Sequence, residues 1–184
     1  MKNIAIIPAR SGSKGIPDKN IRPIAGIPAL AYTIKAAIDS NMFETVMVST
    51  DSEQYAEIAT KYGADVPFLR SEETSTDTSS SWSVVKEVLT KYEEMGKYFD
   101  TIALLQVTSP LRTGNDIVRA FQEMNTKKAN AIISMCETDT PLAYCNVLPD
   151  DLSLVGFYDD SKYRPRQTRQ IAYHANGAIY LYKT

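Results

Sequence analysis

The sequence of 184 residues has only two cysteines and one histidine. Cys136 and Cys145 are too few for a disulfide framework, and we expect both to be buried thiols. Because His174 is the single histidine, no Cys/His spacing typical of a structural metal site is present. The composition therefore excludes a small disulfide-stapled scaffold and a zinc-finger type of fold.

Long apolar runs and an excess of positive charge are lacking as well. No segment approaches the roughly 20 apolar residues that cross a bilayer, and the apolar start over 1–7 is too short for a signal sequence. Lys and Arg total 20 against 22 Asp and Glu, which gives a formal net charge of -2. A chain of this charge does not attract a nucleic-acid backbone over its whole surface. We therefore expect a cytoplasmic protein with no membrane and no nucleic-acid partner, in which any anion binding is local.

What the sequence does contain is an alternation of short β-rich runs with amphipathic helical stretches. This alternation is typical of an α/β fold, here a Rossmann-like, mainly parallel sheet sandwiched by helices. The 43% of hydrophobic residues are enough for one sizeable core. We predict strands over 3–7, 45–49, 66–69, 101–105, 131–135 and 178–181. We predict helices over 29–40, 53–62, 81–95 and 115–124, with Asp51 able to cap the second.

The alternation breaks over the segment 141–169. This segment is rich in Asp, Tyr, Pro and Arg and has no helical periodicity. We find no repeat or linker that would divide the chain. The pattern therefore predicts a single domain over 1–184, with 141–169 as an inserted lobe or dimerisation arm.

The loop after the first predicted strand combines glycines with cations. Gly12 and Gly15 allow the backbone to turn close to an anion, while Arg10, Lys14 and Lys19 would neutralise it. The second glycine is not followed by the Lys and Ser or Thr of a P-loop, and the Rossmann glycine triplet is absent. A solvated surface loop is the alternative. The position directly after a strand favours a phosphate-binding loop.

Several motifs together resemble the acylneuraminate cytidylyltransferase family. The first loop carries the family's Ala-Arg, Ser-Lys-Gly and Lys-Asn in register, and further matching motifs follow at 49–51, 76–78, 104–106, 108–112 and 176–180. The resemblance covers the whole chain. It implies a fold of the nucleotide-diphospho-sugar transferase type and a homodimer formed through an arm. It also implies an enzyme that makes a CMP-sugar and pyrophosphate from CTP and an acidic, sialic-acid-like nine-carbon sugar.

The resemblance also implies site residues. The nucleotide-binding set is Arg10, Ser11, Gly12, Lys14, Gly15, Lys19, Asn20, Arg70, Ser81 and Gln106. The sugar-binding set is Gln106, Ser109, Arg166 and Gln167. Arg10 and Lys19 are the implied catalytic residues, because neutralising the leaving pyrophosphate is the main chemical demand of nucleotidyl transfer. Without the resemblance, each residue has another interpretation: Arg70 as a surface cation, Ser81 as a helix cap and Gln106 as a strand-end amide that satisfies the backbone.

A Mg²⁺ cofactor is implied too, but no ligand for it is assigned. In the family its carboxylate ligands come from an Asp-x-Asp motif after the segment 176–180. This sequence stops at Thr184, before such a motif, so we expect a truncated chain with the metal ligands beyond it. Asp51 and Asp77 are interpreted as helix-capping or loop residues rather than ligands.

The acceptor sugar stays open. Ala143 and His174 stand where relatives that handle N-acetylneuraminate often carry a Lys and an Arg, so a legionaminate- or pseudaminate-type sugar is an option. We expect the ring of His174 to be packed. Two alternatives remain: a nucleotidyltransferase for 3-deoxy-manno-octulosonate or another sugar, and a module that binds CTP without turnover.

Overall fold

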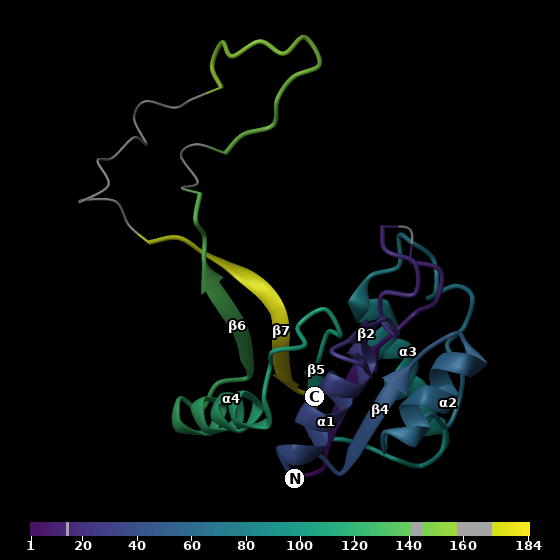
Figure 1. Cartoon of the computed structure of the whole chain (residues 1–184). Coiled ribbons are helices and arrows are strands. Elements are labelled where there is room, and N and C mark those ends of the chain that lie inside the picture. The colour runs from purple at the N-terminus through teal and green to yellow at the C-terminus, as the bar shows by residue number, and fades with distance from the viewer. Residues whose placement is uncertain (14, 141–144, 158–170) are drawn as a thin grey trace. The chain divides into compact units, whose positions relative to one another are not determined.

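The computed structural model describes residues 1–13, 15–140, 145–157 and 171–184 (Figure 1). The described chain divides into two compact units, one made of Met1–Ser134 with Gly177–Thr184 and the other of Met135–Asn176. The second unit contains the segment that was predicted to be a dimerisation arm, and that role stays a prediction.

A five-stranded sheet with the order β4-β1-β5-β7-β6 forms the centre of the first unit. β1 (Asn3–Pro8) pairs in parallel with β4 (Thr45–Ser49) on one side and with β5 (Thr101–Leu104) on the other. β7 (Tyr173–Lys183) runs antiparallel to β5, and β6 (Ala131–Glu137) lies next to β7 at the edge. The predicted α/β fold is confirmed, with one antiparallel strand inside the mainly parallel sheet.

Two short features differ from the predicted elements. The strand predicted over 66–69 is wrong, because the pairing there is a single parallel bridge between Met47 and Asp65, just before that stretch. A small antiparallel hairpin, β2 (Pro23–Ile24) with β3 (Ile27–Pro28), follows the first loop and was not predicted.

Helices follow the strands as the alternation predicts. They are α1 (Ala29–Asp39), α2 (Glu53–Lys61), α3 (Ser81–Glu94) and α4 (Gly114–Thr126). The N-cap of α2 is Ser52, whose hydroxyl accepts from the Tyr55 N–H, so the predicted capping by Asp51 is wrong. Thr113 caps α4 through a reciprocal box with Asp116. Local hydrogen-bonding side chains thus fix where these helices begin.

β1 separates two apolar cores, because its alternate residues point to opposite faces of the sheet. Ala5 and Ile7 pack in the core that includes residues of α1, α2 and α4. Ile4 and Ile6 pack with residues of α3 on the other face. All four side chains are fully buried, as expected for a central strand with helices on both faces.

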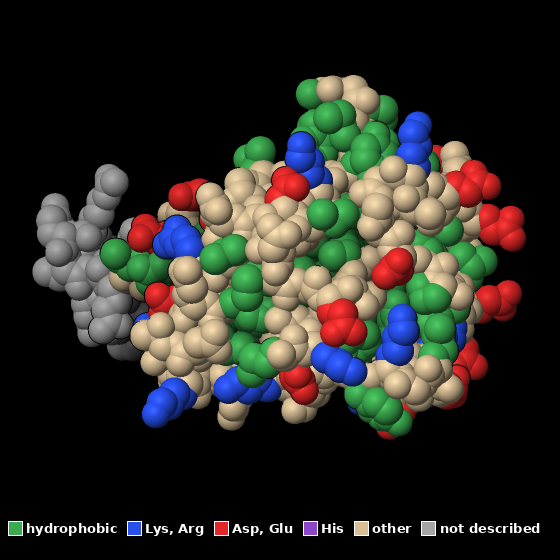
Figure 2. All heavy atoms as spheres, turned by 90° about the horizontal axis from the view of Figure 1, so that it is seen from below, with side chains coloured by type: hydrophobic (Ala, Val, Ile, Leu, Met, Phe, Trp, Pro, Cys, Tyr) green, Lys and Arg blue, Asp and Glu red, His purple; other side chains and the backbone are tan. Residues whose placement is uncertain are grey.

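The surface is mixed in charge. Acidic and basic side chains are interspersed on the face seen in Figure 2. This agrees with the formal net charge of -2 and gives that face no basic stripe. Across the described ranges, no helix has the length and apolar character needed to span a membrane.

The parallel pairing places three strand ends at one edge of the sheet. Pro8 of β1 is in register with Ser49 of β4, and Ile6 of β1 with Leu104 of β5. The ladders continue past the strands, because the Ala9 N–H donates to the Ser49 carbonyl at 2.9 Å. The loops that follow these ends therefore meet where open α/β sheets hold their ligands.

α4 begins at Gly114, and the lack of a side chain there lets α4 lie close to the end of α1. A Cβ atom on Gly114 would lie 2.9 Å from the backbone nitrogen of Ser40 and 3.2 Å from the carbonyl oxygen of Ala36. We expect Gly114→Ala to lower the free energy of unfolding by about 1–3 kcal/mol, since backbone cannot yield as a side chain would. Urea unfolding measures the change.

Asn115→Ala is the matched control for this substitution. Asn115 is the next residue of α4 and is exposed, so alanine there should change the unfolding free energy by less than about 0.5 kcal/mol. Alanine is a better helix former than glycine by about 1 kcal/mol. A Gly114→Ala variant more stable than the parent by about that amount would therefore mean that the two helices are not in tight contact.

Candidate functional site

A cavity of about 250 Å³ opens at the carboxyl edge of the sheet. Its walls come from the loop after β1, the stretch between Arg70 and α3, and the end of β5. The residues of the predicted nucleotide set that line it are Arg10, Lys19, Asn20, Arg70, Ser81 and Gln106. The structure therefore gathers, in one cavity, polar groups from three stretches of the sequence that are far apart.

Arg10 enters the cavity directly after β1. Its Nη2 donates to Oδ1 of Asp77 at 2.6 Å, and its Nη1 reaches the Gly12 carbonyl at 3.5 Å. Asn20 is buried, and its Nδ2 donates to the Arg10 carbonyl at 2.9 Å. Asn20 thus holds the main chain of Arg10, while Lys19 is exposed at the rim. The cavity has one cation engaged by a carboxylate and a second one open to solvent.

Among the other predicted residues of the first loop, the described ones, Ser11, Gly12 and Gly15, do not line the cavity. Ser11 donates from its N–H and its hydroxyl to the carboxylate of Asp51, at 2.7 and 2.8 Å. Gly12 has φ +64, the turn for which a glycine was predicted, and Gly15 is exposed. Lys14 lies outside the described residues. Ser11 and Gly12 therefore shape the loop, and their positions do not indicate a direct contact with a ligand.

Asp51 fixes the first loop through its hydrogen bonds from Ser11. Of the two roles predicted for it, helix capping and loop hydrogen bonding, the structure shows the second. Burial by itself raises the pKa of Asp51, but the hydrogen bonds from Ser11 and the positive charge of Arg70 lower it below its usual value. The ionised carboxylate therefore joins the first loop to the end of β4.

Arg70 is buried, so the alternative of a surface cation is wrong. Its Nε donates to the Ser49 hydroxyl at 3.0 Å and its Nη2 to the Ser49 carbonyl at 2.6 Å. Burial lowers the pKa of Arg70, whereas the nearby charges of Asp51 and Glu87 raise it. The result is a fixed positive charge in the cavity wall at the end of β4.

A wall of hydroxyl groups completes the cavity on the side of α3. Thr74, Thr76 and Ser79 line it together with Ser81. The N-cap of α3 is Ser80, whose hydroxyl accepts from the Ser83 N–H, so Ser81 is not the cap. Sequence reasoning missed the first three residues, although the density of Ser and Thr over 74–81 was a usable signal.

Glu87 of α3 fastens the start of this hydroxyl-rich stretch. Its carboxylate accepts from the Ser71 N–H at 2.8 Å, from the Thr74 hydroxyl and from Lys91 Nζ at 2.6 Å. Burial alone raises the pKa of Glu87, but these hydrogen bonds lower it to about 2. Glu87 therefore stays ionised and holds the loop over the whole neutral range.

Gln106 follows β5, and its carboxamide lies against Gly177. A Cβ on Gly177 would stand 2.5 Å from Gln106 Oε1, and Gly177 also has φ +76. Only glycine satisfies both conditions without strain. The Asn-Gly-Ala-Ile-Tyr stretch over 176–180 thus leaves room for the side chain of Gln106 at the cavity.

Arg112 is a buried cation that sequence reasoning did not single out. Its Nη1 donates to the carbonyls of Gln106 at 3.2 Å and Ala178 at 2.8 Å, and so joins the loop after β5 to the middle of β7. Burial lowers the pKa of Arg112 to about 10, although the charge of Asp116 opposes this. The contact with Ala178 spans 66 residues of sequence, so no local pattern predicts it.

The predicted sugar-binding residues are only partly described. Ser109 accepts from the Arg112 N–H in a turn and does not line the cavity. Arg166, Gln167 and Ala143 lie outside the described residues. Within the second unit, His174 is exposed and its Nε2 lies 3.2 Å from Cys136 Sγ.

Two expectations about this unit are wrong. The ring of His174 is not packed, because it projects from the strand to solvent. The thiols are not buried either, since Cys136 is half-buried and Cys145 exposed.

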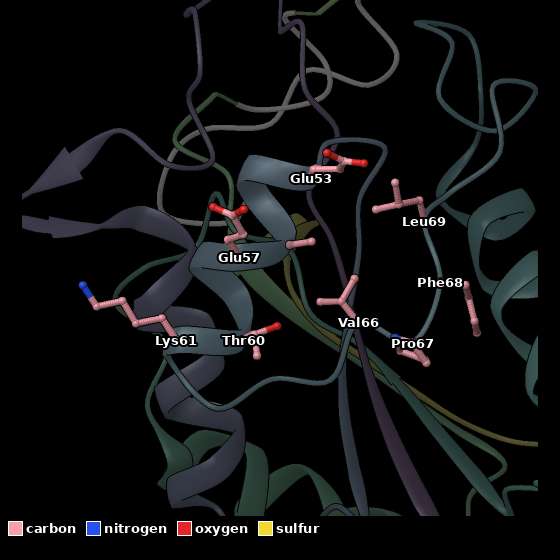
Figure 3. A pocket seen from close by; sticks show the side chains of 9 residues that line it. Glu53, Glu57, Thr60, Lys61, Val66, Pro67, Phe68 and Leu69 are labelled. Carbon is pink, nitrogen blue, oxygen red and sulfur yellow. The ribbon is translucent and has the colours of Figure 1, made fainter.

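The remaining described residues offer a second hollow but no cluster of metal-binding side chains. A hollow of about 760 Å³ lies between α2 and the stretch 66–69, with Val66 and Pro67 at its floor and Lys61 directed away from them (Figure 3). It contains none of the predicted residues. In the described part of the chain, no three His, Cys, Asp or Glu side chains gather as a metal site.

Comparisons with known proteins agree with this geometry. A family model described as cytidylyltransferase matches residues 4–182. The chain is 43% identical over 181 residues to an N-acylneuraminate cytidylyltransferase of Escherichia coli, covering 98% of the chain and 42% of that protein. It is 39% identical to a CMP-N,N'-diacetyllegionaminic acid synthase of Legionella pneumophila and 34% identical to a pseudaminic acid cytidylyltransferase of Campylobacter jejuni, covering 98% of the chain and 78% of each. The chain thus spans well under half of the first relative and most of the other two.

A solved structure shows the same fold. It is a CMP:2-keto-3-deoxy-manno-octonic acid synthetase in complex with CTP, with a TM-score of 0.73 and 20% identity. The match covers 100% of this chain and 74% of the other. At this identity the likeness supports the architecture alone.

The role of Glu87 predicts a dependence of stability on pH. We expect Glu87→Gln to lower the free energy of unfolding at pH 7 by about 1–3 kcal/mol, because a charge-assisted network is lost. The pKa of Glu87 is depressed in the folded chain, to about 2 from 4.5. The stabilisation is therefore complete above 4.5 and disappears as the pH falls toward 2.

Urea unfolding of both proteins at several pH values between 7 and 2 measures this. The difference between Glu87→Gln and the parent should shrink across that acidic window. A difference that persists at pH 2 would mean that the ionised carboxylate is not what holds Ser71 and Thr74.

The contact between Gly177 and Gln106 predicts the result of a second substitution. Gly177→Ala should cost about 1–2 kcal/mol for the positive φ and, in addition, displace the carboxamide of Gln106. The side-chain amide signal of Gln106 in a ¹H–¹⁵N spectrum reports the displacement.

Gly96→Ala is its matched control. Gly96 has φ +73, but nothing lies within 4 Å of the position of a Cβ there. It should show the φ cost alone and leave the Gln106 signal in place. An unmoved Gln106 signal in Gly177→Ala would contradict the close packing described above.

Proposed function

The chain belongs to the cytidylyltransferase family, and on that premise we propose that it transfers CMP from CTP to a sialic-acid-like nonulosonic acid and releases pyrophosphate. The observation that carries the proposal is the convergence of Arg10, Lys19, Arg70 and Gln106 on one cavity at the carboxyl edge of the sheet. Since the chain covers 42% of one relative, the activity of a whole protein is part of the proposal.

The first-loop end of the cavity suits the phosphates. Arg10 and Lys19 supply positive charge there, and Asn20 holds the main chain of Arg10 in place. In the proposed step the anomeric hydroxyl of the sugar attacks the α-phosphorus, the bond from that phosphorus to the β-phosphate bridging oxygen breaks, and pyrophosphate leaves. Such a step needs alignment and charge neutralisation more than covalent help from the protein.

Other groups that line the same cavity suit the nucleoside. Cytosine presents an amino donor and carbonyl and ring-nitrogen acceptors. The Ser81 hydroxyl and the Gln106 carboxamide each offer both a donor and an acceptor, and Arg70 adds a fixed donor group.

For the acceptor we propose an acidic nine-carbon sugar of the N-acylneuraminate, legionaminate or pseudaminate type. The relatives named above carry these sugars in their names. Gln106 and Ser109 lie at the end of β5, where the sugar would meet the α-phosphate. Arg166 and Gln167 are proposed to bind the carboxylate of the sugar, because a guanidinium pairs with it through two parallel hydrogen bonds.

Mg²⁺ is proposed as the cofactor that would neutralise the phosphates. The described residues do not supply a cluster of carboxylates that fits it, so no residue is assigned as a ligand and no step is derived through the ion. We also propose a cytoplasmic homodimer with 141–169 as its arm, on the family resemblance alone.

Binding and turnover test the proposal. Calorimetry should show CTP bound more tightly than UTP or ATP. With Mg²⁺, pyrophosphate should be released when N-acetylneuraminate, legionaminate or pseudaminate is added. Release only with 3-deoxy-manno-octulosonate would select the alternative sugar. CTP binding without release from any acceptor would select the binding module.

Arg10→Ala tests the assignment of the phosphates. We expect kcat/KM for CTP to fall about 100-fold, as when one preorganised donor is removed from a charged transition state. Because the Arg10–Asp77 pair is partly exposed, the free energy of unfolding should change by less than about 1 kcal/mol. Arg119→Ala, at an exposed arginine of α4, should change neither quantity, and equal losses in the two variants would refute the assignment.

A further inference from the structure

The cation at the entrance of the cavity already has an anionic partner. Arg10 Nη2 and Asp77 Oδ1 are 2.6 Å apart, the distance of a strong charge-assisted hydrogen bond. The two side chains are 28% and 38% exposed, so solvent and solutes reach both. The pair spans 67 residues of sequence and joins the first loop to the hydroxyl-rich stretch before α3.

The stretch that carries Asp77 is held in place by its own hydrogen bonds. Its start is fastened to Glu87 through Ser71. Nearer to Asp77, the hydroxyls of Thr76 and Ser79 lie 2.7 Å apart, and Ser79 Oγ donates to the Glu73 carbonyl at 2.9 Å. The carboxylate of Asp77 is thus presented to Arg10 by an ordered turn whose residues also line the cavity.

We propose that Asp77 is an affinity-determining residue, because its carboxylate competes with the phosphate groups of the nucleotide for the guanidinium of Arg10. The inference rests on the proposed function, which assigns Arg10 to the phosphates. Asp77 engages Nη2 of Arg10, so a phosphate that binds through two parallel hydrogen bonds from the two terminal nitrogens competes with Asp77 for Nη2. An anionic ligand therefore has to displace Asp77 before it gains its full contact.

The competition penalises only ligands that use Arg10. Pyrophosphate and CTP both bring phosphate oxygens to it, whereas cytidine has none. Removing the carboxylate should therefore strengthen the binding of pyrophosphate and CTP and leave the binding of cytidine unchanged. This is the opposite of what a residue that binds the nucleotide or its metal ion would do.

Titration calorimetry with inorganic pyrophosphate, without added Mg²⁺ and at fixed ionic strength, is the first measurement. Asp77→Asn should lower the Kd about two- to fivefold, the range spanned by partly exposed ion pairs. Glu73→Gln is the control, because Glu73 is an exposed carboxylate of the same stretch and its loss changes the net charge equally. It should leave the Kd within about 1.5-fold of the parent.

A double-mutant cycle shows whether the effect acts through Arg10. In an Arg10→Ala background, Asp77→Asn should have no effect on the Kd for pyrophosphate. The same tightening in both backgrounds would mean general repulsion of anions and would overturn the proposal. Weaker or unchanged pyrophosphate binding by Asp77→Asn would overturn it as well.

The same variants separate this inference from the proposed function. If Asp77→Asn tightens pyrophosphate binding but no variant binds CTP, competition at Arg10 holds and the cytidylyltransferase proposal fails. If the parent binds CTP and releases pyrophosphate but Asp77→Asn tightens neither ligand, the proposed function holds and competition by Asp77 is wrong.

Discussion

The parallel pairing of β1 with both β4 and β5 is the constraint on which the rest of the structure depends. It brings the carboxyl ends of three strands to one edge and aligns Pro8 with Ser49. The loops that follow carry Arg10, Asp51 and Gln106, which are otherwise distant in sequence. The pairing is stabilised by the complete burial of residues 4–7 of β1 between two apolar cores. Packing of the core thus determines where the polar groups of the cavity meet.

Much of this could be predicted from local sequence. Apolar runs such as 3–7 and 101–105 gave the buried strands, and glycines with cations after the first strand indicated the loop at the cavity. Where these predictions failed, contacts with neighbouring residues outweighed the local structural preference of the sequence. The stretch 66–69 has strand-like residues but is not paired as a strand, and the only bridge nearby is at Asp65. Ser52 caps α2, while Asp51 is engaged by Ser11.

The remaining features depend on contacts between distant residues and have no local signal. The local sequence indicates that Arg112 is a surface residue of a turn, and only the fold brings the Ala178 carbonyl to its side chain. Gly177 reads as an ordinary turn glycine until Gln106 is placed against it. The hydroxyl wall is visible in composition, but its attachment to Glu87 requires α3 to be packed on the sheet. These contacts form only when the chain is folded, so the local sequence does not predict them.

The three arginines near the cavity are held in physically different ways, and the difference restricts which of them can regulate binding. Arg70 and Arg112 are buried and donate to main-chain carbonyls, so moving either would break buried hydrogen bonds to the main chain. Arg10 is partly exposed, and its strong partner is a side chain that can be replaced by another anion. A fixed buried cation gives the cavity its shape and a constant potential. Adjustment to an arriving polyanion therefore falls to Arg10, where exchanging one anionic partner for another leaves the main-chain hydrogen bonds of the sheet intact.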